Sequence, residues 1–264
     1  MTRRRRRAKQ IPFNKILPNM ITSGSVLCGM FSLMLTYQRH FLPSALVLMI
    51  AVFFDYMDGR VARSLGGSSA FGEELDSLAD SLSFGAAPAF LIYAKYIGLD
   101  GGTLGPIGTA FFALCGVLRL ARFNVSHSTG SFQGLPIPAA GLGLASLVIA
   151  DFPMTPKLAA VVMIALGSLM ISTVPYGNVK LLKRGNVNRK KALLLMGIVV
   201  SCFVLLRERA LLALLSIYVA SGPLGIDWGA WLALTPVESD EKTAPREERS
   251  EEHTSELQSP SWIS

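Results

Sequence analysis

The chain has 264 residues, of which 51% are hydrophobic and 16% charged, and its mean hydropathy is +0.44. Soluble domains usually carry about a quarter charged residues, whereas the charges here gather in short joints between long apolar stretches. This distribution excludes an ordinary soluble domain and indicates an all-α polytopic membrane protein. The net charge of +7 does not indicate a nucleic-acid partner, because most basic residues lie beside apolar segments, where they set topology and bind anionic membrane lipid.

The sequence divides into three expected parts. Residues 1–15 are basic, with an arginine run from Arg3 to Arg7, and the apolar stretch that follows is too long for a signal-peptide core, so we expect a retained first helix. Residues 16–222 are expected to form a transmembrane domain. Residues 223–264 are polar and predicted to be disordered, and the stretch 249–259 reads like the translated sequence of a sequencing adapter, which we exclude from the fold.

The transmembrane domain is predicted from the lengths of its apolar segments. A membrane-spanning helix needs about 20 largely apolar residues. The sequence predicts eight such helices, the last two of them short, at residues 18–38, 42–63, 72–96, 104–123, 136–152, 157–177, 190–206 and 208–222.

The basic residues predict the orientation of these helices, because cytoplasmic joints carry an excess of lysine and arginine. With the N-terminus inside, the outer joints hold only Arg39, Lys157, Arg207 and Arg209. The inner joints hold many more, namely Arg60, Arg63, Arg119, Arg122, Lys180, Lys183, Arg184, Arg189, Lys190 and Lys191. We therefore expect a cytoplasmic N-terminus.

Two pairs of aspartates lie beside the first predicted inner joint. Asp55 and Asp58 are three residues apart near the end of the second predicted helix, and Asp76 and Asp80 are four apart near the start of the third. Each pair projects from one face of its helix. Because a short joint makes the two helices antiparallel neighbours, we expect all four carboxylates to converge on one pocket near the inner membrane surface.

A cluster of this kind needs a cation. One charged side chain at mid-bilayer costs about 2.5–3.5 kcal/mol, and less near the interface, and four carboxylates also repel one another. Only Arg60 and Arg63 are close in sequence. Open sites of hard oxygen ligands suit Mg²⁺ or Mn²⁺ carrying a substrate phosphate. The competing interpretation is that the acids are solvated helix ends paired with these arginines.

The pairs belong to a longer pattern, Asp55-x2-Asp58-Gly59-x2-Ala62-Arg63-x8-Gly72-x3-Asp76-x3-Asp80, which occupies eight positions over 26 residues. This pattern resembles, without departure, the signature of the CDP-alcohol phosphotransferases. The resemblance implies a six-helix core, usually in a homodimer, with a divalent-metal site at the cytoplasmic surface. It also implies transfer from a CDP-linked lipid to an alcohol with release of CMP.

The resemblance also implies residue roles. Asp55, Asp58 and Asp76 would bind metal, and Asp80 would complete the site and act as base on the incoming hydroxyl. The positions that would make room for the cytidine diphosphate, with Arg63 and Asp58 close to it, are Gly59, Ala62 and Gly72. Glycine permits close approach of a ligand to the helix backbone, although glycines also serve helix packing in membranes.

Four further stretches resemble the phosphatidylserine synthases within this family, at residues 17–22, 81–88, 119–124 and 134–140. Together the similarity covers roughly residues 12–222. It implies CDP-diacylglycerol and L-serine as substrates, and two C-terminal transmembrane helices beyond the six-helix core. It further implies a place in the plasma (inner) membrane of a bacterium, with the active site facing the cytoplasm.

The candidate acceptor or phosphate ligands are Arg119, Arg122, Asn124 and Ser83. The arginine fork suits a phosphate or the serine carboxylate, although both arginines could instead snorkel to the inner surface. Ser83 could equally be a helix-packing hydroxyl.

Two other functions compete with serine transfer. The first is the same chemistry with glycerol 3-phosphate, inositol phosphate or choline as acceptor. The second is divalent-cation transport, which is disfavoured because a permeation path needs polar groups through the membrane's depth, whereas these acids lie at one surface.

Overall fold

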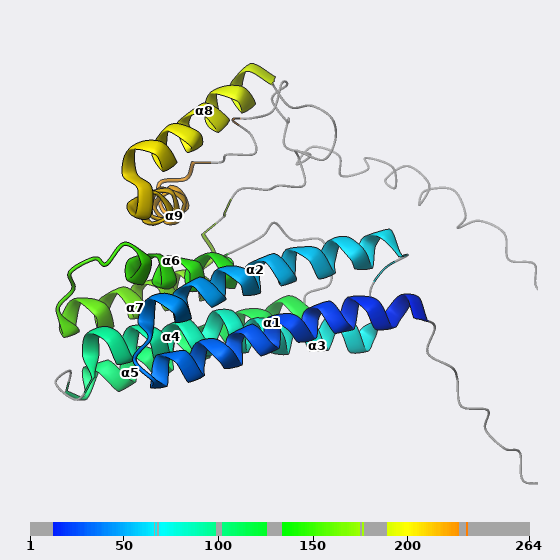
Figure 1. Cartoon of the computed structure of the whole chain (residues 1–264), viewed down its shortest axis with the longest axis horizontal. Coiled ribbons are helices and arrows are strands. Elements are labelled where there is room, and N and C mark those ends of the chain that lie inside the picture. The colour runs from blue at the N-terminus through cyan, green and yellow to red at the C-terminus, as the bar shows by residue number, and fades with distance from the viewer. Residues whose placement is uncertain are drawn as a thin grey trace, which may run out of the picture.

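The computed structural model describes residues 13–65, 67, 69–98, 102–125, 134–174, 176, 189–226 and 231. Every regular element within these ranges is a helix, as the sequence predicts (Figure 1). The arginine run, the suspected adapter stretch and almost all of the polar tail lie outside the described residues.

Each of the eight predicted segments contains helix. In chain order the elements are α1 (Phe13–Tyr37), α2 (Phe41–Ser64), α3 (Ala70–Asp80), η1 (Ser81–Ala86), α4 (Ala87–Ile92), η2 (Tyr93–Ile97), α5 (Leu104–Val125), α6 (Ile137–Ile149), α7 (Pro156–Ile171), α8 (Arg189–Leu206), η4 (Arg207–Arg209) and α9 (Ala210–Ser221). Among the described residues, three helical stretches are long and apolar enough to cross a membrane: Ile16–Tyr37, Phe41–Ser64 and Leu104–Val125. Eight crossings therefore remain a prediction.

Two helices end earlier than the sequence predicts. α6 ends at Ile149 because the chain turns sharply at Asp151, whose φ of 42° is left-handed and outside the helical range. α7 ends at Ile171 because Ser172 is extended, with a ψ of 165°. At its other end Thr155 caps α7, its hydroxyl accepting a hydrogen bond from the amide of Leu158 at 3.3 Å.

The third predicted span is one continuous helical segment, residues 70–97, with two wider π turns, η1 and η2. Pro88 lies just after η1 and has no N–H to donate to the carbonyl of Phe84, which disturbs the regular α pattern there. Gly141 of α6 packs directly on this carbonyl, since a β-carbon at Gly141 would lie 2.6 Å from the Phe84 oxygen. The two stretches 81–88 and 134–140 thus belong to one helix contact, where Gly85 adjoins Ile137.

Buried hydroxyl groups join α1 to α2. Ser44 on α2 lies 2.8 Å from the Ser32 hydroxyl and 2.7 Å from that of Thr36, both on α1. All three side chains are buried. Such interhelical hydrogen bonds contribute to association where apolar contact gives no preference over lipid, so they hold α2, which carries the first aspartate pair, against α1.

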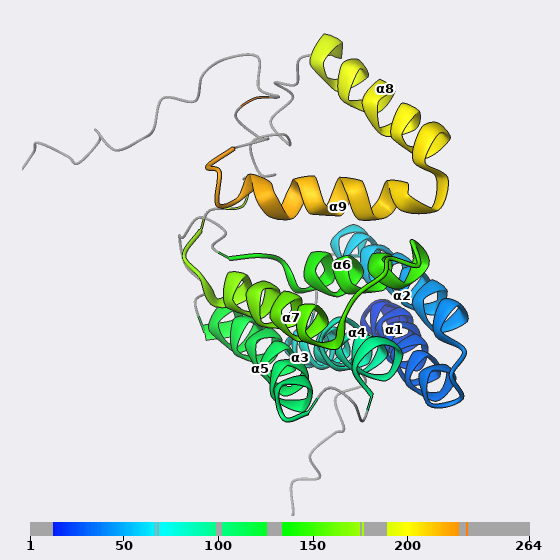
Figure 2. The same ribbon diagram turned by 90° about the vertical axis from the view of Figure 1, so that its left-hand side faces the viewer.

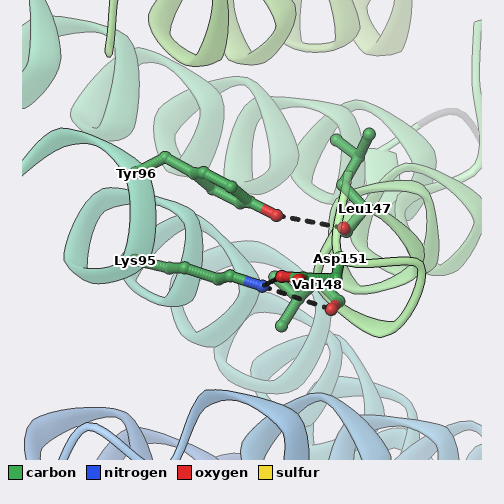
Figure 3. A network of polar contacts seen from close by, with 5 residues as sticks. All are labelled: Lys95, Tyr96, Leu147, Val148 and Asp151. Atoms are coloured by element: carbon green, nitrogen blue, oxygen red, sulfur yellow. Dashed lines mark hydrogen bonds and ion pairs between the residues drawn. The ribbon is translucent and has the colours of Figure 1, made fainter. Parts of the chain in front are cut away.

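A polar network joins η2 to the end of α6 at the opposite end of the helices from the aspartates (Figure 3). The Lys95 ammonium donates to Asp151 at 2.7 Å and to the carbonyl of Val148 at 3.4 Å. The Tyr96 hydroxyl donates to the carbonyl of Leu147 at 3.0 Å. Both carbonyls belong to the last turn of α6, where main-chain oxygens lack partners within the helix.

We predict unequal effects from removing parts of this network. Tyr96→Phe should destabilise the protein by about 1 kcal/mol, because a half-buried hydrogen bond is lost while the ring is kept. Asp151→Asn should have little effect, because the Asp151 side chain is 87% exposed and its ion pair is screened by solvent. Thermal unfolding of both variants in detergent measures the difference. A larger loss of stability in Asp151→Asn than in Tyr96→Phe would contradict this prediction.

Candidate active site

The site begins where α2 ends and α3 starts. The Ser69 hydroxyl caps α3 by accepting a hydrogen bond from the amide of Gly72 at 3.0 Å, so the helix starts at Ala70, ahead of Asp76. Asp55 from α2 and Asp76 and Asp80 from α3 each offer a carboxylate oxygen within 4.8 Å of the others. The predicted convergence of the two pairs is therefore present for these three residues.

Asp58 lies beside this group and is not a member of it. Its side chain is 5% exposed and one oxygen, Oδ2, is buried without a hydrogen-bond partner among the described residues. Thr22 of α1 adjoins its carboxylate. The charge of Asp58 interacts with those of Asp76 and Asp80, so its place as a fourth ligand stays a prediction.

The donor set fits a divalent cation. Asp80 is 9% exposed, and its Oδ1 is buried and without a hydrogen-bond partner in the described part of the chain, like Oδ2 of Asp58. Unpaired buried carboxylate oxygens are costly. Hard oxygen donors that face one another at this spacing are the ligands of Mg²⁺ and Mn²⁺. The alternative of solvated helix ends does not account for the burial of Asp58 and Asp80.

Arg119 from α5 provides a positive charge on the side of Asp80. Its side chain is half-buried, its Nε has no hydrogen-bond partner among the described residues, and its guanidinium interacts electrostatically with Asp80. A snorkelling arginine would direct its head to water. The half-buried position of Arg119 and its interaction with Asp80 instead favour a role in the site.

The end of α2 presents three of the predicted nucleotide-binding residues together. Arg63 is exposed and folds back over Gly59, so that a β-carbon at Gly59 would lie 3.4 Å from the guanidinium. Ala62 is half-buried one turn along, where its carbonyl accepts the amide of Gly67 at 2.9 Å. Gly59 and Ala62 leave the backbone at this helix end open to a ligand, and the Arg63 guanidinium beside them is a cation that a bound diphosphate would need.

Gly72 has a packing role, which is the alternative that the sequence analysis left open. It is buried, and a β-carbon there would lie 2.8 Å from Oδ1 of Asn19 on α1 and 3.2 Å from the Ser69 hydroxyl. Asn19 therefore occupies part of the space that a side chain at position 72 would need. Its role toward the nucleotide stays a prediction.

We predict that Gly72→Ala lowers stability by about 1–3 kcal/mol, because the added methyl overpacks this contact. Adding Asn19→Ala should restore most of the loss, since it removes the group that the methyl meets. Thermal unfolding of the single and double variants measures this rescue. A double variant no more stable than Gly72→Ala would show that Asn19 is not the obstacle.

The other acceptor candidates are placed differently. Asn124 donates to the hydroxyl of Ser77 on α3 at 3.0 Å, so it lies next to the second aspartate pair. Arg122 is exposed in the last turn of α5. Ser83 is fully buried and donates to the carbonyl of Ser25 on α1 at 2.8 Å, which favours its packing role.

Sequence reasoning missed two residues beside the site, Ser77 and Thr22. Ser77 follows Asp76 directly and meets Asn124, and Thr22 adjoins Asp58. Thr22 belongs to the stretch 17–22 that resembles the phosphatidylserine synthases, and this resemblance could have indicated it. Ser77 gave no signal, because serines on exposed helix faces are common.

The fold and the site define a helical integral membrane protein in which α2 and α3 bring three aspartates together in a partly buried cluster. A family model described as CDP-alcohol phosphatidyltransferase matches residues 15–205, most of the chain, and the protein belongs to this family. It is therefore a transferase.

Curated relatives agree with this assignment. The chain is 37% identical over 184 residues to the CDP-diacylglycerol–serine O-phosphatidyltransferase of Helicobacter pylori (strain ATCC 700392 / 26695), covering 66% of this chain and 77% of the relative. It is 38% identical over 171 residues to the archaetidylserine synthase of Methanothermobacter thermautotrophicus, covering 62% and 70%. The CDP-diacylglycerol–serine O-phosphatidyltransferase of Bacillus subtilis is 34% identical over 165 residues, covering 62% and 91%.

Proposed function

We propose that this protein transfers the phosphatidyl group of CDP-diacylglycerol to the hydroxyl of L-serine, giving phosphatidylserine and CMP. The observation that carries the chemistry is the cluster of Asp55, Asp76 and Asp80, within 4.8 Å of one another, in a chain of this family. Serine as acceptor is supported by the names of the bacterial relatives.

In the proposed reaction the serine oxygen forms a bond to the phosphorus of the phosphatidyl group, and the bond from that phosphorus to the CMP oxygen breaks. Asp80 accepts the proton of the serine hydroxyl. Asp55, Asp58 and Asp76, with Asp80, hold Mg²⁺ or Mn²⁺, which supplies neutralisation of the diphosphate charge and of the charge that grows on CMP.

The remaining residues bind and orient. Gly59, Ala62 and Arg63 at the end of α2 receive the cytidine diphosphate, together with Gly72. Arg119, whose charge interacts with that of Asp80, would bind the serine carboxylate beside the base. Asn124 and Arg122 lie at the same end of α5, and Asn124 reaches α3 through Ser77.

The proposed setting is the plasma membrane of a bacterium, with the site facing the cytoplasm and two copies of the chain forming a homodimer. The basic inner joints support this orientation. The apolar side chains exposed along α1 and α2, such as Leu27, Phe31, Leu46 and Phe53, suit contact with lipid or with a second copy.

Release of CMP by the purified protein tests the function. CDP-diacylglycerol would be supplied with serine, glycerol 3-phosphate, inositol phosphate or choline in separate reactions, and we expect CMP to form with serine. If CMP forms with another alcohol and not with serine, serine is wrong and that alcohol is the acceptor. Metal flux into liposomes without any CDP-lipid would instead support a transporter.

A further inference from the structure

α5 and the helical segment 70–97 run antiparallel, side by side (Figure 2). Three contacts between them share one register: Ile97 with Gly105, Gly85 with Gly116, and Ser77 with Asn124. The last two contacts are separated by eight residues on each helix, which is about 12 Å along the axis. The meeting of Ser77 and Asn124 therefore follows from the packing of the whole helix pair, at the end that carries the aspartates.

This contact is a hydrogen bond between two helices. The side-chain amide of Asn124, in the last turn of α5, donates to the hydroxyl oxygen of Ser77 on α3 at 3.0 Å. The Ser77 hydroxyl in turn donates to the carbonyl of Glu73 within α3 at 3.1 Å. Both side chains are half-buried, whereas Phe123 and Val125 on either side of Asn124 are exposed. Asn124 thus joins the end of α5 to α3.

α1 holds the same segment from another side. Asn19 adjoins Gly72, and Ser83 donates to the carbonyl of Ser25 at 2.8 Å. Gly72 and Ser83 are about three helical turns apart, so they lie on one face, whereas Ser77 lies about 140° around the helix from Gly72. Contacts from two neighbouring helices on different faces therefore fix the rotation of α3 about its axis. By the same periodicity, the second aspartate pair projects from the sector between these two contacts.

The rotation of α3 decides where its carboxylates lie. Side-chain atoms lie about 5 Å from the axis of a helix, so a rotation of about 10° moves them by about 1 Å. Asp55 comes from another helix, α2, and must stay within 4.8 Å of Asp76 and Asp80. A binding site of this kind needs its ligands held to about 0.5 Å. The cluster therefore depends on contacts that prevent α3 from turning.

We propose that Asn124 is a positioning residue for the metal site: its hydrogen bond to Ser77 holds α3 in the rotation that brings Asp76 and Asp80 to Asp55. This inference rests on the proposed function, in which these carboxylates hold the metal. It gives Asn124 a task different from binding the acceptor, because Asn124 acts through α3 and without contact to serine.

Equilibrium binding of Mn²⁺ to the full-length protein in detergent, without any substrate, tests this assignment. Electron paramagnetic resonance of the free ion measures the Kd. We expect Asn124→Ala to raise the Kd for Mn²⁺ about three- to tenfold, as for loss of one hydrogen bond, and Ser77→Ala to do the same. The double variant should bind Mn²⁺ no more weakly than either single variant, because both substitutions remove one interaction. At saturating Mn²⁺ the KM for serine should stay unchanged in Asn124→Ala.

Tyr96→Phe is the matched control, since it also removes one hydrogen bond between helices, at the opposite end from the aspartates. It should lower the thermal midpoint and leave the Kd for Mn²⁺ unchanged. An unchanged Kd in Asn124→Ala or Ser77→Ala, additive effects in the double variant, or an equal rise of the Kd in Tyr96→Phe would each overturn the inference. A higher KM for serine in Asn124→Ala with an unchanged Kd would instead assign Asn124 to the acceptor.

Failure of the proposed function gives different results. A wild-type protein that binds no Mn²⁺ would refute the metal site itself. A wild-type protein that binds Mn²⁺ but releases no CMP with serine would refute serine transfer, while the expected Kd values in the variants would still support the positioning role of Asn124.

Discussion

Replacing Asp80 with asparagine is expected to abolish transfer while the protein still inserts and folds. A positioned general base contributes about 10²–10⁴ to the rate, and asparagine keeps the shape of the side chain but cannot accept the proton of the serine hydroxyl. Asp80 also completes the carboxylate group with Asp55 and Asp76, so loss of a metal ligand adds to the effect. CMP release by purified protein in lipid measures the rate.

Glu74→Gln is the matched control for this variant. Glu74 is an exposed acid on the same helix, α3, and removing its charge should leave turnover unchanged. Membrane fractionation and thermal unfolding of both variants check that insertion and folding are retained. Unchanged turnover in Asp80→Asn would remove Asp80 from its role as base.

Removal of divalent metal is expected to have an effect of similar size. Chelation should stop CMP release, and added Mg²⁺ or Mn²⁺ should restore it, because Asp55, Asp76 and Asp80 otherwise repel one another as like charges in a partly buried site. A ligand that binds only the folded state stabilises it by about 2.7 kcal/mol at one hundred times its Kd. Mn²⁺ should therefore raise the thermal midpoint even when no substrate is present.

Variants of the ligands give the control. Asp55→Asn should weaken the Mn²⁺-dependent rise in the thermal midpoint. Without metal the same variant should be more stable than the wild type, because one half-buried charge is removed from the cluster. Asp58→Asn tests the residue outside the group of three, and an undiminished rise would exclude it as a ligand. A wild-type midpoint unaffected by Mn²⁺ or Mg²⁺ would contradict the metal site itself.

The sequence by itself determined the helical class and the acidic cluster. Apolar segments long enough to span a membrane form helices there, because a helix satisfies its backbone hydrogen bonds within the segment. Spacings of three and four residues then place each aspartate pair on one helix face. The short joint after Ser64 keeps α2 and α3 close in the chain, but both helices pack mainly against α1, so the meeting of Asp55 with Asp76 and Asp80 also depends on α1.

Only the tertiary structure decided what each remaining side chain meets. Asn19 adjoins Gly72, the Ser83 hydroxyl donates to the carbonyl of Ser25, and the Tyr176 hydroxyl donates to the carbonyl of Val219 on α9. Periodicity shows which residues share a face of one helix, but the rotation of that helix and the identity of its neighbour depend on packing among all the helices. Contacts between distant helices are therefore absent from any local pattern in the sequence.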